Sequence, residues 1–317
     1  MGLYPGQRLN NYRLKNQIAC GGMGQVWLAW DEERGVNVAI KTIADNLFVD
    51  PNFTKRFFDE GRRHIKLNHP NIVPVYDVFS AEHYNCLVMA FIEGASLADI
   101  LDNQPDYRMP LATAIPIVQD ILGALNYAHK HGIIHRDIKP ANILIYKKNG
   151  RGFLIDFGIA LAIGEDRRTC TGQSIGTPHY MSPEQITNPK GIDHRTDVYS
   201  VGCVFYEMLT GRPPFVAEMA TGGETDFAIK RAHVNLIPKP PTERVNTIPA
   251  YINDVILFAL EKKPENRLPG CQEFLRLLQV GETKPIVKIR KSRRPYLYLL
   301  VATVITLIVV ISVLLIK

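Results

Sequence analysis

Four side chains in the middle of the chain have the types and spacing that a phosphoryl-transfer site needs. The chain reads HRDIKPAN, and DFG begins fourteen residues after the Asn of that run. Asp137 can accept the proton of an attacking hydroxyl, and Lys139 lies where it can neutralise the migrating phosphoryl charge. Asn142 and Asp156 supply oxygen ligands for Mg²⁺. This spacing predicts metal-assisted phosphoryl transfer.

A second set of residues lies upstream, in a context suited to holding ATP. Lys41 ends a VAIK run in an expected strand, and Glu60 lies in the helix expected after it. An ion pair between them would hold Lys41 against the α and β phosphates. A lone Lys or Glu is by default a solvated surface residue, so it is the strand and helix context that favours a functional role here.

With these motifs the chain resembles the eukaryotic-like protein kinases, specifically their bacterial membrane-bound Ser/Thr members. The resemblance runs from about Tyr12 to Gln279. It implies an α+β, bilobal protein kinase fold over 12–279. A small β-rich N-lobe is expected at about 12–92 and a larger helical C-lobe at about 95–279.

Residue patterning agrees with two lobes. Short apolar-polar alternations broken by Gly at 12–43 predict a three-stranded antiparallel sheet. Phe53 to Leu67 has helical spacing, and strands are expected near 74–79 and 86–92. Beyond Gly94 the pattern becomes helical, with the longer candidate helices at 111–131, 196–210, 252–262 and 272–278.

The resemblance implies a particular set of ATP-binding residues. The Gly-rich segment IACGGMGQV would cover the phosphates, although Ala19 replaces the first Gly of the GxGxxG pattern. Met89 is expected beside the adenine, with the Ala90 carbonyl and the Ile92 amide making the hinge hydrogen bonds. The complete expected set is Ile18, Ala19, Cys20, Gly21, Gly22, Met23, Gly24, Val26, Ala39, Lys41, Met89, Ala90 and Ile92.

The same resemblance assigns the chemistry. Asp137, Lys139, Lys41 and Glu60 are the expected catalytic residues, and the cofactors are ATP and Mg²⁺, with Mn²⁺ as an alternative ion. Lys139 after the catalytic Asp favours Ser or Thr over Tyr as the acceptor. The substrates are therefore expected to be proteins that present Ser or Thr hydroxyls.

Further residues are expected to support or control the site. Glu184, in an SPE run, should pair with Arg267, and Asp197 should bond backbone amides of the catalytic loop. Thr177 is expected to hydrogen-bond Asp137 and Lys139. Arg136 places a cation beside the catalytic Asp, where it can receive an anion from the segment between DFG and SPE. The twin threonines expected to be autophosphorylated there are Thr169 and Thr171.

The C-terminal region predicts a membrane anchor. Residues 297–316 carry no charged side chain, and twenty residues match the thickness of a hydrocarbon core. We therefore expect a transmembrane helix at 295–316, preceded by a basic juxtamembrane linker at 280–294. Six Lys or Arg precede the helix and Lys317 follows it, which predicts a single-pass membrane protein with a cytoplasmic kinase domain. A buried globular helix is the alternative interpretation.

Composition excludes other classes. The net charge of +6 comes from the C-terminal region, since residues 1–280 hold equal numbers of basic and acidic side chains. A general nucleic-acid surface is not expected. The five scattered Cys form no CxxC pair, which indicates reduced thiols and no structural zinc.

Partners and alternatives follow from this assignment. Expected partners are protein substrates, membrane lipid and a second copy of the chain in a homodimer that phosphorylates in trans. One alternative is a membrane-tethered pseudokinase scaffold, favoured only by Ala19 and Ala90. Another is a small-molecule phosphotransferase, which would lack the long segment between DFG and SPE.

Overall fold

The chain divides into two units, Met1–Gly281 and Glu282–Lys317. In a computed structural model of the protein, the described residues all belong to the first unit, at positions 2–21, 24–44, 51–157, 178–216 and 225–281. The predicted linker, apart from its first two residues, and the predicted membrane helix lie outside them. Both therefore stay predictions.

A six-stranded antiparallel sheet forms the N-lobe, in the order β1-β2-β3-β4-β6-β5. Its β2–β4 part confirms the three-stranded sheet predicted at 12–43. Trp27, Ala29 and Asp31 are buried while their neighbours are more exposed, which is the period-two pattern of a strand with one face on the core. The strands are β1 (Arg8–Leu9), β2 (Tyr12–Gly21), β3 (Gly24–Asp31), β4 (Val36–Ala44), β5 (Val75–Ala81) and β6 (Tyr84–Ala90).

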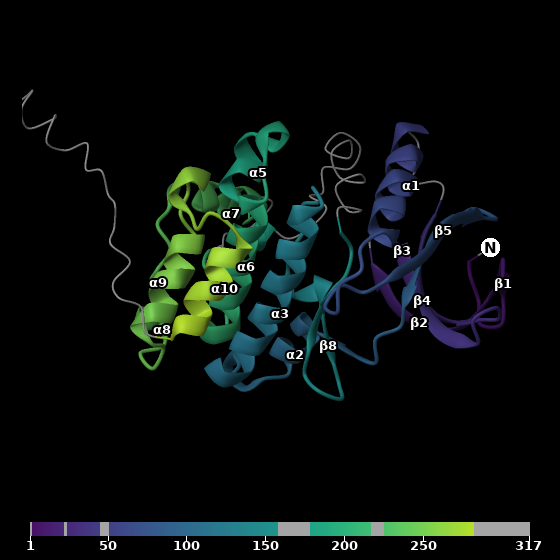
Figure 1. The fold of residues 1–317 in the computed structure, drawn as a ribbon, viewed down its shortest axis with the longest axis horizontal. Helices are drawn as coiled ribbons and strands as arrows, with labels where there is room; N and C mark the ends of the chain where they lie inside the picture. The colour runs from purple at the N-terminus through teal and green to yellow at the C-terminus, as the bar shows by residue number, and fades with distance from the viewer. Residues whose placement is uncertain (1, 22–23, 45–50, 158–177, 217–224, 282–317) are drawn as a thin grey trace, which may run out of the picture. The chain divides into compact units, whose positions relative to one another are not determined.

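One long helix, α1 (Pro51–Ile65), packs against β5 of this sheet (Figure 1). Its inner face buries Phe57, Gly61 and His64, whose spacing of four and three residues is that of one helix face. A Cβ on Gly61 would lie 3.1 Å from a methyl group of Val78. The absent side chain therefore lets the helix approach the sheet closely.

Helices dominate the C-lobe, and α6 passes through its centre with thirteen of its sixteen residues buried. Helix α3 packs against both α6 and α10. A small sheet of β7, β8 and β9 lies on the side facing the N-lobe (Figure 1). The elements are β7 (Gly94–Ser96), α2 (Leu97–Asp102), α3 (Leu111–Lys130), β8 (Ile143–Tyr146), β9 (Gly152–Leu154), α5 (Pro183–Thr187), α6 (Arg195–Thr210), α7 (Thr225–Asn235), α8 (Pro241–Arg244), α9 (Ala250–Ala259) and α10 (Cys271–Val280).

The described helices differ in whether they are long enough to span a membrane. Among them, α3 alone is long and apolar enough to cross a bilayer by length and composition. Eight of its residues are buried within the C-lobe, including Ile117, Val118 and Ile121. Packing of this kind is typical of the core helix of a globular domain.

Two helices differ from the sequence prediction. The helix expected at 252–262 ends at Ala259, and the chain then reaches Lys263, which precedes a proline and has extended backbone. Lys262 instead donates a hydrogen bond of 2.7 Å to the carbonyl of His233. Helix α7 was not predicted, since the polar and apolar residues of TDFAIKRAHVN are too mixed to mark one face.

Candidate active site

The catalytic loop brings three of the predicted residues into direct contact. Lys139 Nζ lies 2.8 Å from Asp137 Oδ2. The Asn142 amide donates to the same oxygen at 2.9 Å and to the Asp137 carbonyl at 2.7 Å. With its nitrogen used in this way, Asn142 has its amide oxygen left as an acceptor. The loop thus fixes a carboxylate, an ammonium and an oxygen ligand within one hydrogen-bonded group.

Lys41 pairs with Asp156, the Asp of the DFG run. Lys41 Nζ lies 2.7 Å from Asp156 Oδ2, and each side chain is 13% exposed. Lys41 is thus paired with the Asp of DFG, and Glu60, its predicted partner, lies half-buried on α1. The Lys41–Glu60 pair stays a prediction. Burial raises the pKa of Asp156, but the charge and hydrogen bond of Lys41 outweigh burial and hold the pKa below its ordinary value of 3.8. Asp156 is consequently a carboxylate.

Asp156 has one oxygen available for a cation. Its Oδ1 is buried and has no hydrogen-bond partner among the described residues. Its backbone has φ 62°, a left-handed conformation that is uncommon for a residue other than Gly. A strained residue that presents an unpartnered anionic oxygen beside a lysine fits a metal ligand.

Asp197 holds the start of the catalytic loop. Its carboxylate, completely buried in α6, accepts hydrogen bonds of 2.8 Å from the amides of His135 and Arg136. The predicted contact with the loop amides is thus present. Arg136 has φ 67°, so these bonds stabilise a strained backbone. His129 Nε2, 2.7 Å away, makes the third contact.

A column of three rings connects α1 with this loop. The Phe157 ring lies 4.6 Å from that of His135 and 5.1 Å from that of His64. His135 Nε2 also donates to the Ile155 carbonyl at 2.8 Å. His64 is 3% exposed, and neither ring nitrogen has a hydrogen-bond partner among the described residues. Burial lowers the pKa of His64 to about 4, so its ring is neutral.

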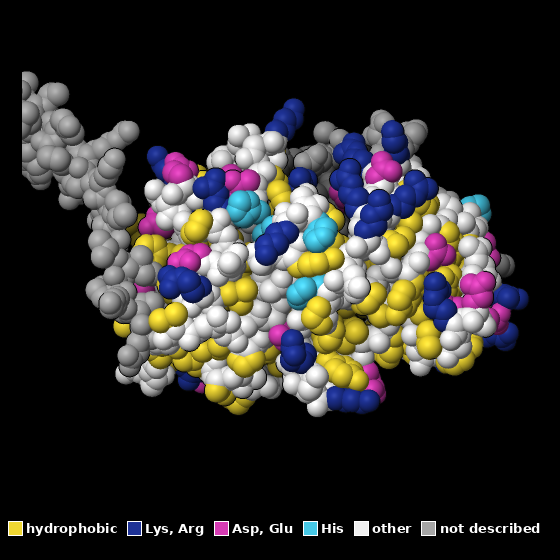
Figure 2. Space-filling view, in the orientation of Figure 1, with side chains coloured by type: hydrophobic (Ala, Val, Ile, Leu, Met, Phe, Trp, Pro, Cys, Tyr) yellow, Lys and Arg dark blue, Asp and Glu magenta, His cyan; other side chains and the backbone are white. Residues whose placement is uncertain are grey.

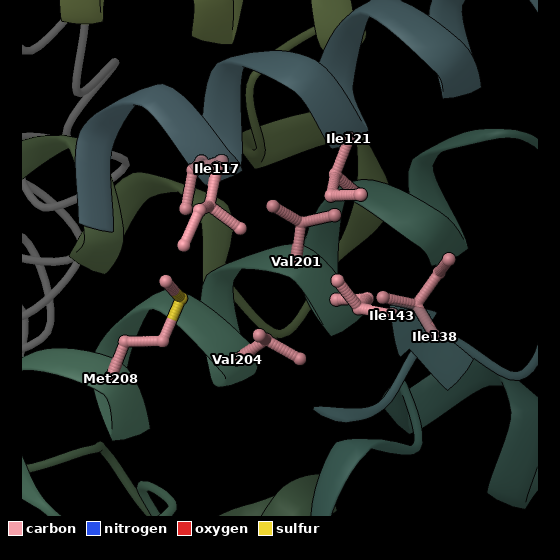
Figure 3. Close-up of a pocket in the computed structure, with 8 residues that line it drawn as sticks. Ile117, Ile121, Ile138, Ile143, Val201, Val204 and Met208 are labelled. Atoms are coloured by element: carbon pink, nitrogen blue, oxygen red, sulfur yellow. The ribbon is translucent and has the colours of Figure 1, made fainter. Parts of the chain in front are cut away.

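A small apolar cavity lies beneath the catalytic loop (Figure 3). Ile138 and Ile143, which alternate in sequence with the loop's functional side chains, point into it together with residues of α3 and α6. Apolar anchoring on both sides of the functional residues keeps the loop fixed to the C-lobe core. The lining residues are Ile117, Val118, Ile121, Ile138, Ile143, Val201, Val204 and Met208.

Residues predicted to surround the adenine gather around the N-lobe core. Ala39 and Met89 belong to that core, and Val26, Ala90 and Ile92 pack against it. Two further side chains pack there that the sequence analysis did not assign, Leu144 and Ile155. The amide of Ile92 makes no hydrogen bond within the described part of the chain, as a hinge donor to a ligand requires.

The Gly-rich segment forms the β2–β3 hairpin. Ala19 pairs with Val26, and both Ile18 and Cys20 are exposed. Gly24 has φ +143°, and a Cβ there would lie 2.1 Å from the carbonyl oxygen of Thr42. Only Gly fits this position. Gly22 and Met23 lie outside the described residues, and Gly21 pairs with Gly24 beside them.

An ion pair within the C-lobe matches the predicted one. Arg267 donates from both terminal nitrogens to Glu184, at 2.5 and 2.6 Å, and Thr196 donates to the same carboxylate at 2.8 Å. The Arg267 side chain is 0% exposed. Burial raises the pKa of Glu184, but the Arg267 contacts outweigh burial and hold it below 4.5. The pair fixes α5 to the segment before α10.

Several predicted residues cannot be placed. Thr169, Thr171 and Thr177 lie outside the described residues. Arg136, their predicted partner, has a buried Nε with no hydrogen-bond partner and forms no ion pair within the described chain. Its charge is available to an incoming anion.

The sequence predicted the motifs that contain some of the site residues but not the roles of those residues. His135 and Phe157 belong to the HRD and DFG runs, but the contact between their rings depends on how the fold brings the two runs together. His129 precedes HRD by six residues, and only the fold brings it to Asp197. His64 carried no signal at all, because a histidine on an expected helix face predicts no specific partner. Each role depends on contacts between distant segments.

Comparison with known proteins assigns the family. The chain matches the protein kinase domain over residues 12–277 and therefore belongs to the protein kinase family. It is 42% identical over 270 residues to the serine/threonine-protein kinase PknB of Mycobacterium leprae, across 84% of this chain and 42% of PknB. PknB of Mycolicibacterium smegmatis is 41% identical over 271 residues, with the same two shares.

Solved structures show the same fold. The crystal structure of the Mycobacterium tuberculosis PknI kinase domain superposes with a TM-score of 0.72 at 24% identity, covering 89% of this chain and 100% of that one. The chain spans about two fifths of the length of the PknB relatives.

Breaking the Glu184–Arg267 pair should destabilise the C-lobe in a pH-dependent way. Glu184→Gln leaves a buried guanidinium uncompensated, which costs about 3–5 kcal/mol, or roughly 10 °C in Tm. Because the folded pKa of Glu184 lies below 4.5, this stability is present above pH 4.5 and is lost as pH falls through the folded pKa. Thermal unfolding between pH 7 and 4 measures it.

The matched control is Glu273→Gln, which removes a carboxylate from a surface pair with Arg276. Surface pairs contribute less than about 1 kcal/mol. Equal losses in the two variants at neutral pH would contradict a dominant role for the buried pair.

His64→Leu should stabilise the packing of α1. The substitution keeps an apolar contact with Phe157 and removes two buried, unpaired ring nitrogens, whose desolvation costs about 1–3 kcal/mol. We expect Tm to rise by several degrees. His69→Leu is the control, since His69 accepts a hydrogen bond of 3.1 Å from the Asn71 amide and its loss should lower Tm. A destabilised His64→Leu protein would show that the ring nitrogens are satisfied.

Proposed function

We propose that the chain is a protein kinase that transfers the γ-phosphoryl group of ATP to Ser or Thr hydroxyls of proteins. The observation that carries this proposal is the convergence of Asp137, Lys139 and Asn142 in one bonded group, with Lys41 paired to Asp156. These residues come from both lobes. A pseudokinase scaffold is not favoured, because Ala19 removes no functional side chain.

Each residue has one role in the transfer. The Asp137 carboxylate accepts the proton from the substrate hydroxyl as its oxygen attacks the γ-phosphorus. Lys139, bonded to Asp137, neutralises charge on the migrating group. Lys41 holds the α and β phosphates. Positioning and electrostatics supply most of the rate enhancement in reactions of this type.

The metal ligands are Asn142 and Asp156. Both present oxygens, the type that Mg²⁺ prefers, and Asp156 Oδ1 is a buried anionic oxygen without a partner among the described residues. Bound Mg²⁺ neutralises phosphate charge. Across the described residues no cluster of three or more His, Cys, Asp or Glu forms an all-protein metal site. This suits Mg²⁺, which takes most of its ligands from phosphates and water.

Asp137→Asn should lower transfer at least about 100-fold without loss of ATP binding, because the amide cannot accept the hydroxyl proton. Purified protein is incubated with Mg²⁺ and γ-labelled ATP, together with a basic protein and a mixture of small metabolites. Label on protein that disappears in Asp137→Asn supports the kinase. Label on metabolites alone would indicate a small-molecule phosphotransferase, and absence of label would indicate a scaffold.

The proposed kinase is anchored in the membrane by 295–316, with its catalytic domain in the cytoplasm. The support is the uncharged run of twenty residues and the basic residues that precede it. The similar PknB proteins are serine/threonine-protein kinases. A homodimer that phosphorylates in trans would be favoured by confinement to the membrane.

Control is proposed to act through Arg136. Autophosphorylated Thr169 or Thr171 would pair with its guanidinium, which has no carboxylate partner in the described chain. The pair would order the segment between DFG and SPE and so align the substrate.

Replacing Thr169 and Thr171 together by Ala should lower kcat at least about tenfold, since no phosphate can then reach Arg136. Arg136→Ala should produce a similar loss, and combining the three substitutions should add little, because all remove one interaction. Thr113→Ala, on an exposed position of α3, is the control. Full activity of the double-Ala variant would refute the proposal.

A further inference from the structure

Helix α1 has a strongly basic outer face. The exposed side chains of Lys55, Arg62 and Lys66 are seven and four residues apart, which places them within about 40° of one another around the helix. Arg63 is exposed next to them. We define these four residues as the α1 basic face. Figure 2 shows dark blue side chains gathered over α1.

Little compensates this charge. Asp59 lies within the face, but its carboxylate is as far as 4.0 Å from the Arg62 guanidinium. The Arg62 side chain is 69% exposed, so this contact is weak. Lys55, Arg63 and Lys66 form no ion pair within the described chain. By contrast, Arg8 and Arg13 of the same lobe both pair with Glu32. Residues 1–280 are neutral as a whole, so this face is a local concentration of positive charge.

We infer that the α1 basic face docks on an anionic membrane surface. Four long cationic side chains are spread along a helix, with Ile65 exposed beside them to 41%. This arrangement fits a plane of lipid phosphates. A specific phosphopeptide site would be expected to gather buried, convergent donors, and none of these four side chains is buried.

The inference rests on the proposed anchor, which brings the membrane within reach. A linker of fifteen residues spans at most about 50 Å. A compact unit of 281 residues has a radius of gyration of roughly 19 Å, so it is about 50 Å across. The tether is therefore long enough for an N-lobe helix to contact the bilayer. Tethering also raises the effective concentration of the lipid surface.

Docking would connect the membrane with the active site. The buried face of α1 carries His64, which lies about 180° around the helix from Lys55. The His64 ring contacts the Phe157 ring edge-on. Glu60 faces inward on the same helix. Headgroups that hold the outer face would stabilise α1 in the position the structure shows. We therefore expect anionic lipid to stimulate phosphoryl transfer.

The test uses the full chain in nanodiscs of phosphatidylcholine, with or without phosphatidylglycerol. Hydrogen exchange of residues 54–66 and phosphorylation of a basic protein are measured in both lipids. The test variant changes Lys55, Arg62, Arg63 and Lys66 to Gln. The matched control removes the same charge from four exposed C-lobe residues that form no ion pair with the described residues, Lys148, Lys190, Arg231 and Lys263.

Wild type and control should show slower α1 exchange and severalfold higher activity in anionic nanodiscs. The test variant should lose both effects and keep wild-type activity in neutral lipid. Because one cation near an anionic leaflet strengthens association about fivefold, four removals should weaken it more than about a hundredfold. Identical behaviour of the two variants would overturn the inference. So would α1 protection that is equal in neutral lipid, which would assign the face to a protein segment.

Failure of the anchor is measured separately, by extraction of membranes with alkaline carbonate. If the chain is extracted, the anchor is wrong, and cosedimentation of the full chain with phosphatidylglycerol vesicles then decides the inference. Weaker sedimentation of the test variant than of the control supports the α1 basic face. Equal sedimentation overturns it.

Discussion

The candidate active site depends on one buried carboxylate. Asp197 lies in the most buried helix of the C-lobe and accepts hydrogen bonds from two consecutive amides of the catalytic loop. Without it, the left-handed Arg136 would lose the hydrogen bond that its amide makes, and the backbone that leads into Asp137 would be held less firmly. Burial raises the pKa of Asp197, but the His129 contact and the loop amide bonds outweigh burial and keep it ionised. The buried carboxylate of Asp197 thereby positions the carboxylate of Asp137 in the site.

From this fixed loop, contacts extend in two directions. Ile138 and Ile143 fix its underside to α3 and α6, so the loop belongs mechanically to the C-lobe. The Phe157 ring contacts the His135 ring at a tilt and the His64 ring of α1 edge-on, so aromatic contacts connect the N-lobe helix with the loop. The first connection is dense and apolar. The second contains a histidine whose nitrogens are unsatisfied among the described residues, so it is the weaker of the two.

Sequence patterns predicted local elements and motifs but not the contacts that form between distant segments. The hairpin strands of the N-lobe and helices α3, α6 and α10 follow from periodicity and turn residues. The residues of HRDIKPAN and DFG follow from chemistry at fixed spacing. The partner of Lys41 does not, because it depends on where α1 and the 156–157 backbone settle in three dimensions. The cavity under the loop and the column at His64 are likewise products of packing, which no single segment encodes.

The partner of Lys41 also bears on how α1 takes part in function. A lysine ammonium has three donors, so it can contact Asp156, a phosphate and Glu60 at one time only if α1 lies close enough. In the structure the Asp156 contact is short and the α1 helix is positioned by Phe57, Gly61 and His64 against β5 and Phe157. Any ligand of the outer face of α1 acts on these inner contacts, because a helix moves as a rigid element. The free energy of placing this helix is therefore one contribution to control of the site, beside the proposed pairing of Arg136 with a phosphothreonine. The neutral His64 ring on the inner face and the cations on the outer face both contribute to it.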